Sequence, residues 1–170
     1  MRRHSPNRDA KPHANLLHFG DAADYRAAMT AQPPREFASA ILVDTCGRLL
    51  LQLRDDVPGI LYPGFVGLFG GHREGDETFL ECVCREVHEE TSFRVAPDRF
   101  EHMGSYSGSD PGGRRVLGEF FITREIPVDA LRITEGSLLI AQLDQLPELA
   151  PRLVPSALSA VRIFASGGSL

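Results

Sequence analysis

Three glutamates, Glu86, Glu89 and Glu90, stand close together near the middle of the chain. The stretch from about Glu77 to Glu90 is predicted to be a helix, and at about 100° per residue the three side chains fall within one arc of about 100°. Carboxylates held so close repel one another unless a cation lies among them. Hard oxygen ligands of this kind select Mg²⁺ or Mn²⁺. The spacing therefore predicts a divalent-metal site on this helix.

Two glycines, Gly70 and Gly71, precede the predicted helix and suit a tight turn with free backbone carbonyl groups. Mg²⁺ keeps several of its waters and usually bridges protein carboxylates to substrate phosphates. Such a site neutralises a pyrophosphate and activates water, so the indicated reaction is metal-assisted phosphoryl transfer to water. The sequence shows no Ser/His/Asp arrangement and no Cys nucleophile with a positioned base.

The whole stretch GGHREGDETFLECVCREVHEETSF, residues 70–93, resembles the signature of the Nudix hydrolases. The match lies in fixed offsets among Gly71, Glu77, Arg85, Glu86, Val87, Glu89, Glu90 and Phe93. One position departs, because Ser92 stands where the family usually has Gly. A left-handed backbone is common directly after a helix, so serine there would cost roughly 1 kcal/mol.

The resemblance implies roles for the matched residues. Glu86 and Glu90 match the principal metal ligands of the family, and the backbone carbonyl of Gly71 would complete the shell. Glu89 matches a further ligand or an acid that orients metal-bound water. Arg85 would support the site by holding a neighbouring carboxylate such as Glu77 in its ionised form. A simple intrahelical pair of Arg85 with Glu81 is compatible with that role.

The family often draws a further acid from a loop beyond this stretch, as a general base or ligand. Glu135, before Gly136, resembles that position, and Glu119 is the alternative. Each could also be a solvated surface acid. His72 is expected either to touch phosphate or metal-bound water or to be a solvated loop histidine. His88 is predicted to face away from the glutamates and is assigned no role.

The resemblance implies a small nucleotide as substrate, namely a nucleoside diphosphate linked to another moiety. A nucleotide sugar, an ADP-ribose-like compound and an oxidised nucleoside triphosphate all fit. Residues that could stack on a base or pair with a phosphate are Arg54, Tyr62, Phe65, Tyr106, Arg114 and Arg115. The alternative function is a catalytically idle Nudix fold that senses nucleotides or mediates interactions, although the acids of the signature are complete.

Composition describes an ordinary globular domain. The chain has 170 residues and a formal net charge of −5, which argues against a nucleic-acid or anionic-membrane partner. No apolar run approaches the length of a membrane span. The three cysteines have neither disulfide nor metal-ligand spacing, so a cytoplasmic location is expected. Homodimers occur in the family that the chain resembles, so a homodimer is a further expectation.

The remaining elements surround the predicted helix. Residues 1–34 are expected to form an N-terminal arm with a short helix over 21–31, and residues 35–170 a single Nudix domain. Predicted strands are 37–43, 48–54, 65–69, 93–95, 100–106 and 115–126, with short apolar segments at 131–133 and 138–141 and a flexible loop at 107–113. A helical turn is predicted over 142–149 and a C-terminal helix over 156–164, capped by Ser156. This order predicts an α/β/α sandwich around a mixed sheet, which the resemblance also implies.

Overall fold

The fold is that of a computed structural model, which describes residues 32–167. The predicted arm over residues 1–34 and its helix over 21–31 therefore lie almost wholly outside the described residues. Within residues 32–167, no helix is both long and apolar enough to span a membrane.

A mixed sheet of seven strands forms the centre of the described fold. Its strands are β1 (Arg35–Asp44), β2 (Leu49–Leu53), β3 (Val66–Gly67), β4 (Phe69–His72), β5 (Glu101–Ser109), β6 (Arg115–Ile126) and β7 (Ser137–Ala141). The order is β3-β2-β1-β6-β5, while β4 pairs with β1 and β7 pairs with β2. β1 and β6 run parallel, and the other pairs are antiparallel.

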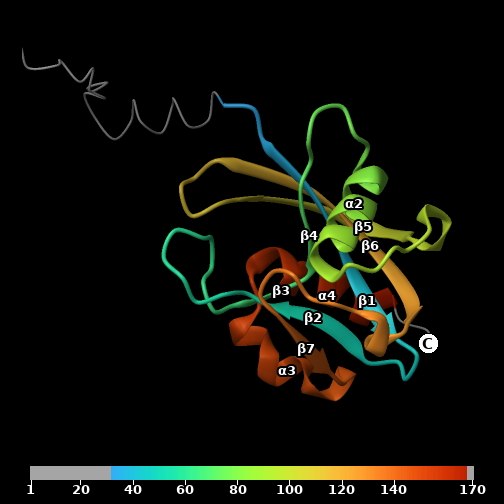
Figure 1. Ribbon diagram of the computed structural model, residues 1–170. Coiled ribbons are helices and arrows are strands. Elements are labelled where there is room, and N and C mark those ends of the chain that lie inside the picture. Colours follow the sequence, from blue (N-terminus) through green and yellow to red (C-terminus); the bar gives the residue numbers. More distant parts are fainter. Residues whose placement is uncertain (1–31, 168–170) are drawn as a thin grey trace, which may run out of the picture.

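Helices cover both faces of this sheet (Figure 1). The helices are α2 (Phe79–Thr91), α3 (Leu146–Leu149) and α4 (Pro155–Gly167), joined by the short 3-10 helices η1 (Pro97–Arg99), η2 (Val128–Ala130), η3 (Leu143–Gln145) and η4 (Ala150–Arg152). Successive side chains of a strand point to opposite faces, so Leu50 packs in the core under α2 while Leu49 and Leu51 pack in the core under α3 and α4. This arrangement confirms the predicted α/β/α sandwich around a mixed sheet.

The strand predictions were right for most of the core and wrong at its connections. Residues 93–95 are not a strand, and β5 continues through residue 109 into the predicted loop. The predicted strand over 65–69 is divided into β3 and β4, which pair with different neighbours. The C-terminal helix begins at Pro155, so Ser156 lies inside it and is not its cap.

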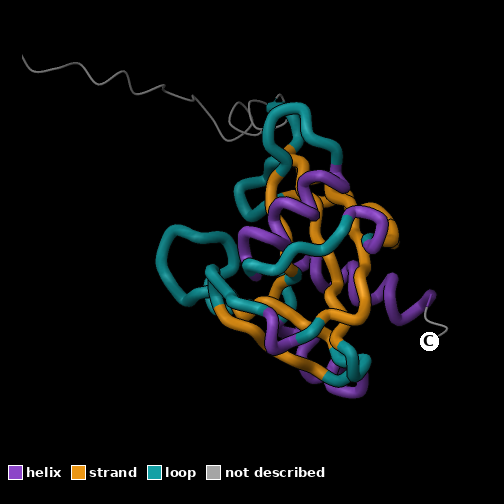
Figure 2. The backbone as a smooth tube through the Cα atoms, turned by 45° about the vertical axis from the view of Figure 1, so that its right-hand side comes forward, coloured by secondary structure: helices purple, strands orange, loops and turns teal. Residues whose placement is uncertain are grey.

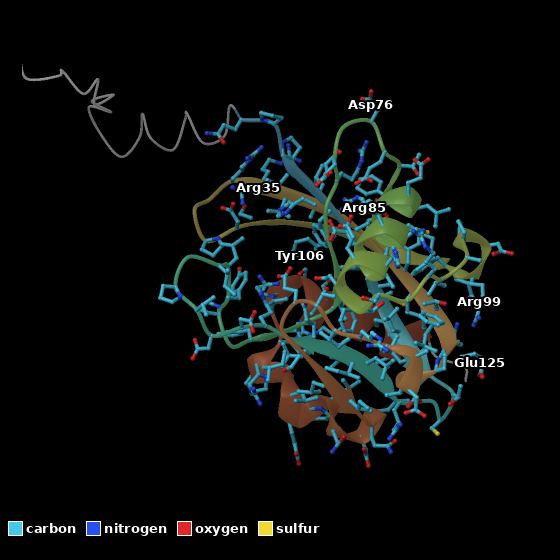
Figure 3. All side chains as sticks on the ribbon, in the orientation of Figure 1. Arg35, Asp76, Arg85, Arg99, Tyr106 and Glu125 are labelled. Carbon is cyan, nitrogen blue, oxygen red and sulfur yellow. The ribbon has the colours of Figure 1, made fainter. Side chains whose placement is uncertain are left out.

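The start and end of α2 are both fixed by side chains near its ends. Thr78 is the N-cap and forms a reciprocal capping box with Glu81, whereas Asp76 lies at the outer tip of the preceding loop (Figure 3). At the other end, Ser92 has φ 53° and ψ 16°, the left-handed conformation expected for this position. A serine therefore occupies a position where glycine has the lower conformational cost.

Candidate metal and active site

The glycine before α2 is required by how closely the helix packs on β4. Gly71 pairs with Ala38 of β1, and α2 lies over both strands. A Cβ atom at Gly71 would collide with the carboxylate of Glu86. The missing side chain thus lets the Glu86 carboxylate lie directly against the Gly71 backbone, and it places the two predicted ligands side by side.

Glu90 is buried between α2 and the sheet, with 7% of its surface exposed. Its Oε2 accepts a hydrogen bond of 2.7 Å from the backbone N–H of Gly70, and its Oε1 accepts one of 2.8 Å from the side-chain amide of Gln52. Burial raises the pKa of Glu90 to about 7, although both hydrogen bonds act in the opposite direction. A cation beside this carboxylate would stabilise its ionised form.

Arg85 links the acids at the start of the helix to those at its middle. Its guanidinium donates to Glu77 at 2.7 and 3.1 Å, to Glu86 at 2.8 Å and to Glu89 at 3.1 Å. A further bond of 3.0 Å joins it to the carbonyl of His72 in β4. The hydrogen bonds from Arg85 lower the pKa of Glu77 to about 2. The contact with Glu77 predicted for Arg85 is present.

The intrahelical alternative for Arg85 is not what the structure shows, because Glu81 is used elsewhere. The Glu81 carboxylate accepts hydrogen bonds from the backbone N–H and the hydroxyl of Thr78, at 2.7 and 2.8 Å. The Glu81 side chain therefore belongs to the capping box at the N-terminus of α2 and does not pair with Arg85.

Glu135 and Glu119, the two candidates beyond the helix, lie in different surroundings. The loop before β7 is tied to the end of α2, since Thr134 donates to the carbonyls of Glu89 and Glu90. Gln52 donates to the carbonyl of Glu135 at 3.2 Å, and the Glu135 charge adds to the rise in the pKa of Glu90. Glu135 is thereby brought to the acidic cluster.

Glu119 instead makes its contacts on the neighbouring strand β5. Its carboxylate accepts hydrogen bonds from the Ser105 hydroxyl at 2.8 and 3.0 Å and lies 2.5 Å from Nε2 of His102. These partners hold it toward β5 and leave Glu135 as the loop acid beside Glu90.

The oxygen donors of this cluster fit a hard divalent cation. In the described part of the chain, no three His, Cys, Asp or Glu side chains already have the spacing of a metal cage. In this structure Nη1 of Arg85 bonds both Glu86 and Glu89 and balances their negative charge. Carboxylates and the Gly71 carbonyl are ligands typical of Mg²⁺ or Mn²⁺. Cys82 lies 3.5 Å from that carbonyl, but burial raises the pKa of its thiol to about 12, so it stays protonated.

A cavity of about 180 Å³ adjoins Gly70 and Gly71. It lies among β1, β5 and the 54–65 loop, which projects from the body of the fold (Figures 1 and 2). Three of the predicted substrate residues, Arg54, Tyr62 and Tyr106, line it. Its aromatic wall is completed by Phe37, whose ring centroid lies 5.9 Å from that of Tyr106. The cavity has the character of a site for a flat, apolar ring.

The loop beside this cavity holds Tyr62 in an unusual conformation. Tyr62 has φ 53°, which is uncommon for an aromatic residue. The adjacent Leu61 carbonyl accepts a hydrogen bond of 3.0 Å from Nε of Arg54, and the Gly64 N–H donates to the carbonyl of Asp55. The loop is thus fixed across its base, with Tyr62 directed to the cavity.

A second recess opens beside His72, at the edge of the same region. Its lining includes Arg35, His72 and Arg114, and its volume is about 440 Å³. Burial lowers the pKa of His72, and the charges of Arg35 and Arg114 lower it further. Phe65 and Arg115, also predicted to contact substrate, lie outside the lining of both hollows in the described residues.

Sequence reasoning missed Gln52 and Arg35. Gln52 has 1% of its surface exposed and stands in β2 among leucines, in the sequence LLLQL. An amide in such a strand needs a buried hydrogen-bonding partner, and that was the available signal. Arg35 begins β1 at the point where the chain enters the sheet, and its contacts depend on the distant β5–β6 turn.

Comparisons with known proteins identify the family and the fold. The family model described as the NUDIX domain matches residues 33–140. No curated protein matches the sequence at a significant level. The solved MutT NUDIX hydrolase from Burkholderia pseudomallei is 24% identical, with a TM-score of 0.64, over 77% of this chain and 98% of that one.

Two further solved structures share the fold. The MutT protein from Methanosarcina mazei Go1 is 20% identical, with a TM-score of 0.71, over 82% of this chain and 99% of that one. A bifunctional NMN adenylyltransferase/ADP ribose pyrophosphatase from Francisella tularensis, complexed with AMP and a Mn ion, is 16% identical with a TM-score of 0.62. That match covers 85% of this chain and 45% of the other.

Proposed function

The chain belongs to the Nudix family, whose domain model spans residues 33–140, and we propose that it is a Mg²⁺-dependent pyrophosphohydrolase of small nucleotides. Mn²⁺ would serve in place of Mg²⁺. The observation that carries the proposal is the position of Glu86, against the Gly71 backbone and within one Arg85-centred network with Glu89. The Francisella tularensis protein, an ADP ribose pyrophosphatase solved with AMP and a Mn ion, supports the nucleotide class.

The residues that would hold the cation are Glu86, Glu89, Glu90 and the carbonyl of Gly71. When bound there, Mg²⁺ neutralises a pyrophosphate and lowers the pKa of a bound water. Gln52 and the Gly70 N–H fix the two oxygens of Glu90, which supports this role. Its burial disfavours free ionisation, so the cation and the carboxylate stabilise each other.

Arg85 and Glu135 would then act on protons and charge. Arg85 keeps Glu77 ionised, and its bonds to Glu77 and to the His72 carbonyl do not involve the carboxylates that would hold the cation. Glu135 is proposed as the general base that accepts the proton of the attacking water, since its loop is anchored to Glu90. The aromatic cavity beside Gly71 would receive the base of the nucleotide.

A direct assay tests this function. Purified protein is incubated with Mg²⁺ and a panel of nucleoside triphosphates, nucleotide sugars and dinucleotides, and products are identified by mass spectrometry. Hydrolysis of a pyrophosphate bond is expected, with kcat reduced by about 10² or more in Glu86→Gln and Glu90→Gln. The matched control Glu148→Gln, an exposed position on α3, should keep full activity.

Two results would contradict the proposal. Activity that survives in both Glu86→Gln and Glu90→Gln would place the chemistry elsewhere. Tight nucleotide binding without turnover by the wild-type protein would identify the catalytically idle sensor instead.

A further inference from the structure

The recess beside His72 forms where three strands meet at one end of the sheet. The start of β1 contributes Arg35 and Glu36, the end of β4 leads into Arg73, and Arg114 directly precedes β6. The strands are in register here, since Arg35 pairs with Val116 and the N–H of Arg73 donates to the carbonyl of Glu36. The recess is therefore built by the sheet itself.

Positive charge exceeds negative charge in this recess. Three guanidinium groups line it, those of Arg35, Arg73 and Arg114. Over the described range, only two carboxylates lie beside them, those of Glu36 and Asp110. Arg73 is closely paired with Glu36, whereas Arg35 lies 3.6 Å from Asp110. Among the described residues, Arg114 has no carboxylate partner, and its Nε donates to the carbonyl of Pro33 at 3.0 Å. Its remaining N–H groups suit an added anion.

Asp110 fixes the turn that presents Arg114. Its Oδ1 accepts from the Arg114 N–H at 3.0 Å, and its N–H donates to the Arg114 carbonyl at 2.9 Å. The same carboxylate pairs with Arg35 through Oδ2. One aspartate thus sets the positions of both arginines, which is the arrangement expected of a built anion site and not of two independent surface arginines.

The recess is continuous with the proposed active site. Arg35 and His72 line both the recess and the aromatic cavity. The carbonyl of His72 accepts a hydrogen bond from Arg85, whose guanidinium also contacts Glu86 and Glu89. Figure 3 labels Arg35 on β1, Tyr106 on β5 and Arg85 on α2. Arg35 would therefore lie beside a molecule that has its base in the cavity, and Asp110 holds Arg114 next to Arg35.

We propose that Arg35 and Arg114 bind a phosphate group of the substrate that lies beyond the cleaved pyrophosphate. The inference rests on the proposed function and names its substrate class: a nucleotide with at least three consecutive phosphates, such as a nucleoside triphosphate, and not a nucleotide sugar. A guanidinium binds phosphate through paired, charge-assisted hydrogen bonds. A neutral sugar at this place would gain little from two arginines.

Matched substrate pairs with the same base test the proposal. The pairs are ATP with ADP-ribose, GTP with GDP-mannose, CTP with CDP-glucose and UTP with UDP-glucose, assayed with Mg²⁺. For the preferred base, the triphosphate should have the higher kcat/KM. Arg114→Gln should raise KM for the triphosphate by about tenfold, which is the scale of one charge-assisted hydrogen bond, and change KM for the nucleotide sugar by less than about twofold.

Two variants make the result specific. Arg162→Gln removes the same charge from an exposed position on α4 and should leave both substrates unchanged. Arg114→Lys keeps the charge but loses the planar fork, and should fall between wild type and Arg114→Gln. Equal effects of Arg114→Gln on both members of a pair, or preference of the wild type for the nucleotide sugar, would overturn the assignment while leaving pyrophosphate hydrolysis intact.

A binding measurement separates this proposal from the failure of the proposed function. Calorimetry with inorganic tripolyphosphate, on metal-free protein of verified thermal stability, reports the anion site without turnover. Affinity should fall about tenfold in Arg114→Gln and in Arg35→Gln, and not in Arg162→Gln. If no nucleotide is hydrolysed but this loss is seen, the phosphate site stands and the hydrolase assignment fails. Equal affinity in all three variants rejects the phosphate site.

Discussion

Gln52 of β2 donates a 2.8 Å hydrogen bond to the carboxylate of Glu90 on α2, and both side chains are buried. The same amide nitrogen donates to the carbonyl of Glu135 at 3.2 Å. One side chain from the sheet therefore sets the distance between the proposed metal ligand and the loop that carries the proposed base. Gln52 acts through these two residues and is a positioning residue.

Replacing Gln52 by leucine should damage both stability and turnover. The change leaves a buried carboxylate oxygen and a carbonyl without their donor, which costs about 1–3 kcal/mol. We expect kcat to fall about tenfold, with a smaller change in KM, and chemical denaturation to show the loss of stability. Gln52→Glu, which adds a charge beside Glu90, should be worse than Gln52→Leu. A leucine variant with unchanged kcat would show that the amide does not position the site.

Replacing Gly71 by alanine should disrupt metal binding selectively. The added Cβ collides with the Glu86 carboxylate, so Glu86 must move away from the backbone carbonyl that it accompanies. We expect Mn²⁺ affinity, measured by electron paramagnetic resonance of the free ion, to fall at least tenfold. Gly167→Ala at the end of α4, where a Cβ meets nothing within 4 Å, is the matched control. Unaltered Mn²⁺ binding in Gly71→Ala would remove Glu86 and Gly71 from the ligand set.

The Arg85–Glu77 pair should make the fold sensitive to acid. The pKa of Glu77 is lowered to about 2 from 4.5 by Arg85, so its stabilising contribution is complete above pH 4.5 and is lost as the pH falls toward 2. Between pH 5 and pH 2, wild type should lose about 2 kcal/mol more than Glu77→Gln, a value reduced from the full shift because the pair lies near the surface. Urea unfolding at each pH measures this difference, and parallel curves for the two proteins would contradict it.

Glu90 should make the stabilisation of the protein by metal larger at high pH than at low pH. Its pKa is raised by burial to about 7 from 4.5, so in metal-free protein its stabilising contribution is complete below pH 4.5 and is lost as the pH rises through 7. A cation binds the ionised carboxylate. The increase in Tm on adding Mg²⁺ should therefore be larger at pH 8 than at pH 5.5. Glu90→Gln should abolish most of that pH dependence, and an equal increase in Tm at both pH values would contradict the prediction.

The backbone after α2 offers a stabilising substitution. Ser92 has φ 53°, and glycine adopts this conformation with less strain, so Ser92→Gly should stabilise the protein by up to about 1 kcal/mol. The corresponding rise in Tm is about 2–4 °C for a domain of this size. Ser92→Ala, which keeps a Cβ atom, should show no such rise. A lower Tm in Ser92→Gly would indicate that the Ser92 side chain contributes to the turn.

Local sequence predicted the helix and the longest strands because each depends on neighbouring residues. Thr78 and Glu81 form their capping box within four residues, and β6 occupies the predicted range from Arg115 to Ile126. The spacing of the glutamates similarly indicated which residues share a face of α2. Division of the 65–69 segment into β3 and β4 depends on pairing with two different strands, which local sequence does not contain.

The surroundings of the site were less predictable for the same reason. Gln52 meets Glu90 across 38 positions of sequence, and Arg35 meets Asp110 across a still longer separation in sequence. The choice between Glu135 and Glu119 was open because both are acids after the signature. The partners of Glu119 on β5 and the bonds that tie the Glu135 loop to the end of α2 distinguish them. Long-range contacts of this kind decide which acids gather.

The contacts of Arg85 have a consequence for the protein when no divalent cation is bound. Because its guanidinium bridges Glu86 and Glu89, Arg85 serves as the counter-ion of these two carboxylates in the absence of magnesium. Binding of a divalent cation at the proposed site would then replace one positive charge with another, so the glutamates of α2 would have a positive partner in both states. Removal of the metal by a chelator should therefore be reversible, because Arg85 would pair again with Glu86 and Glu89.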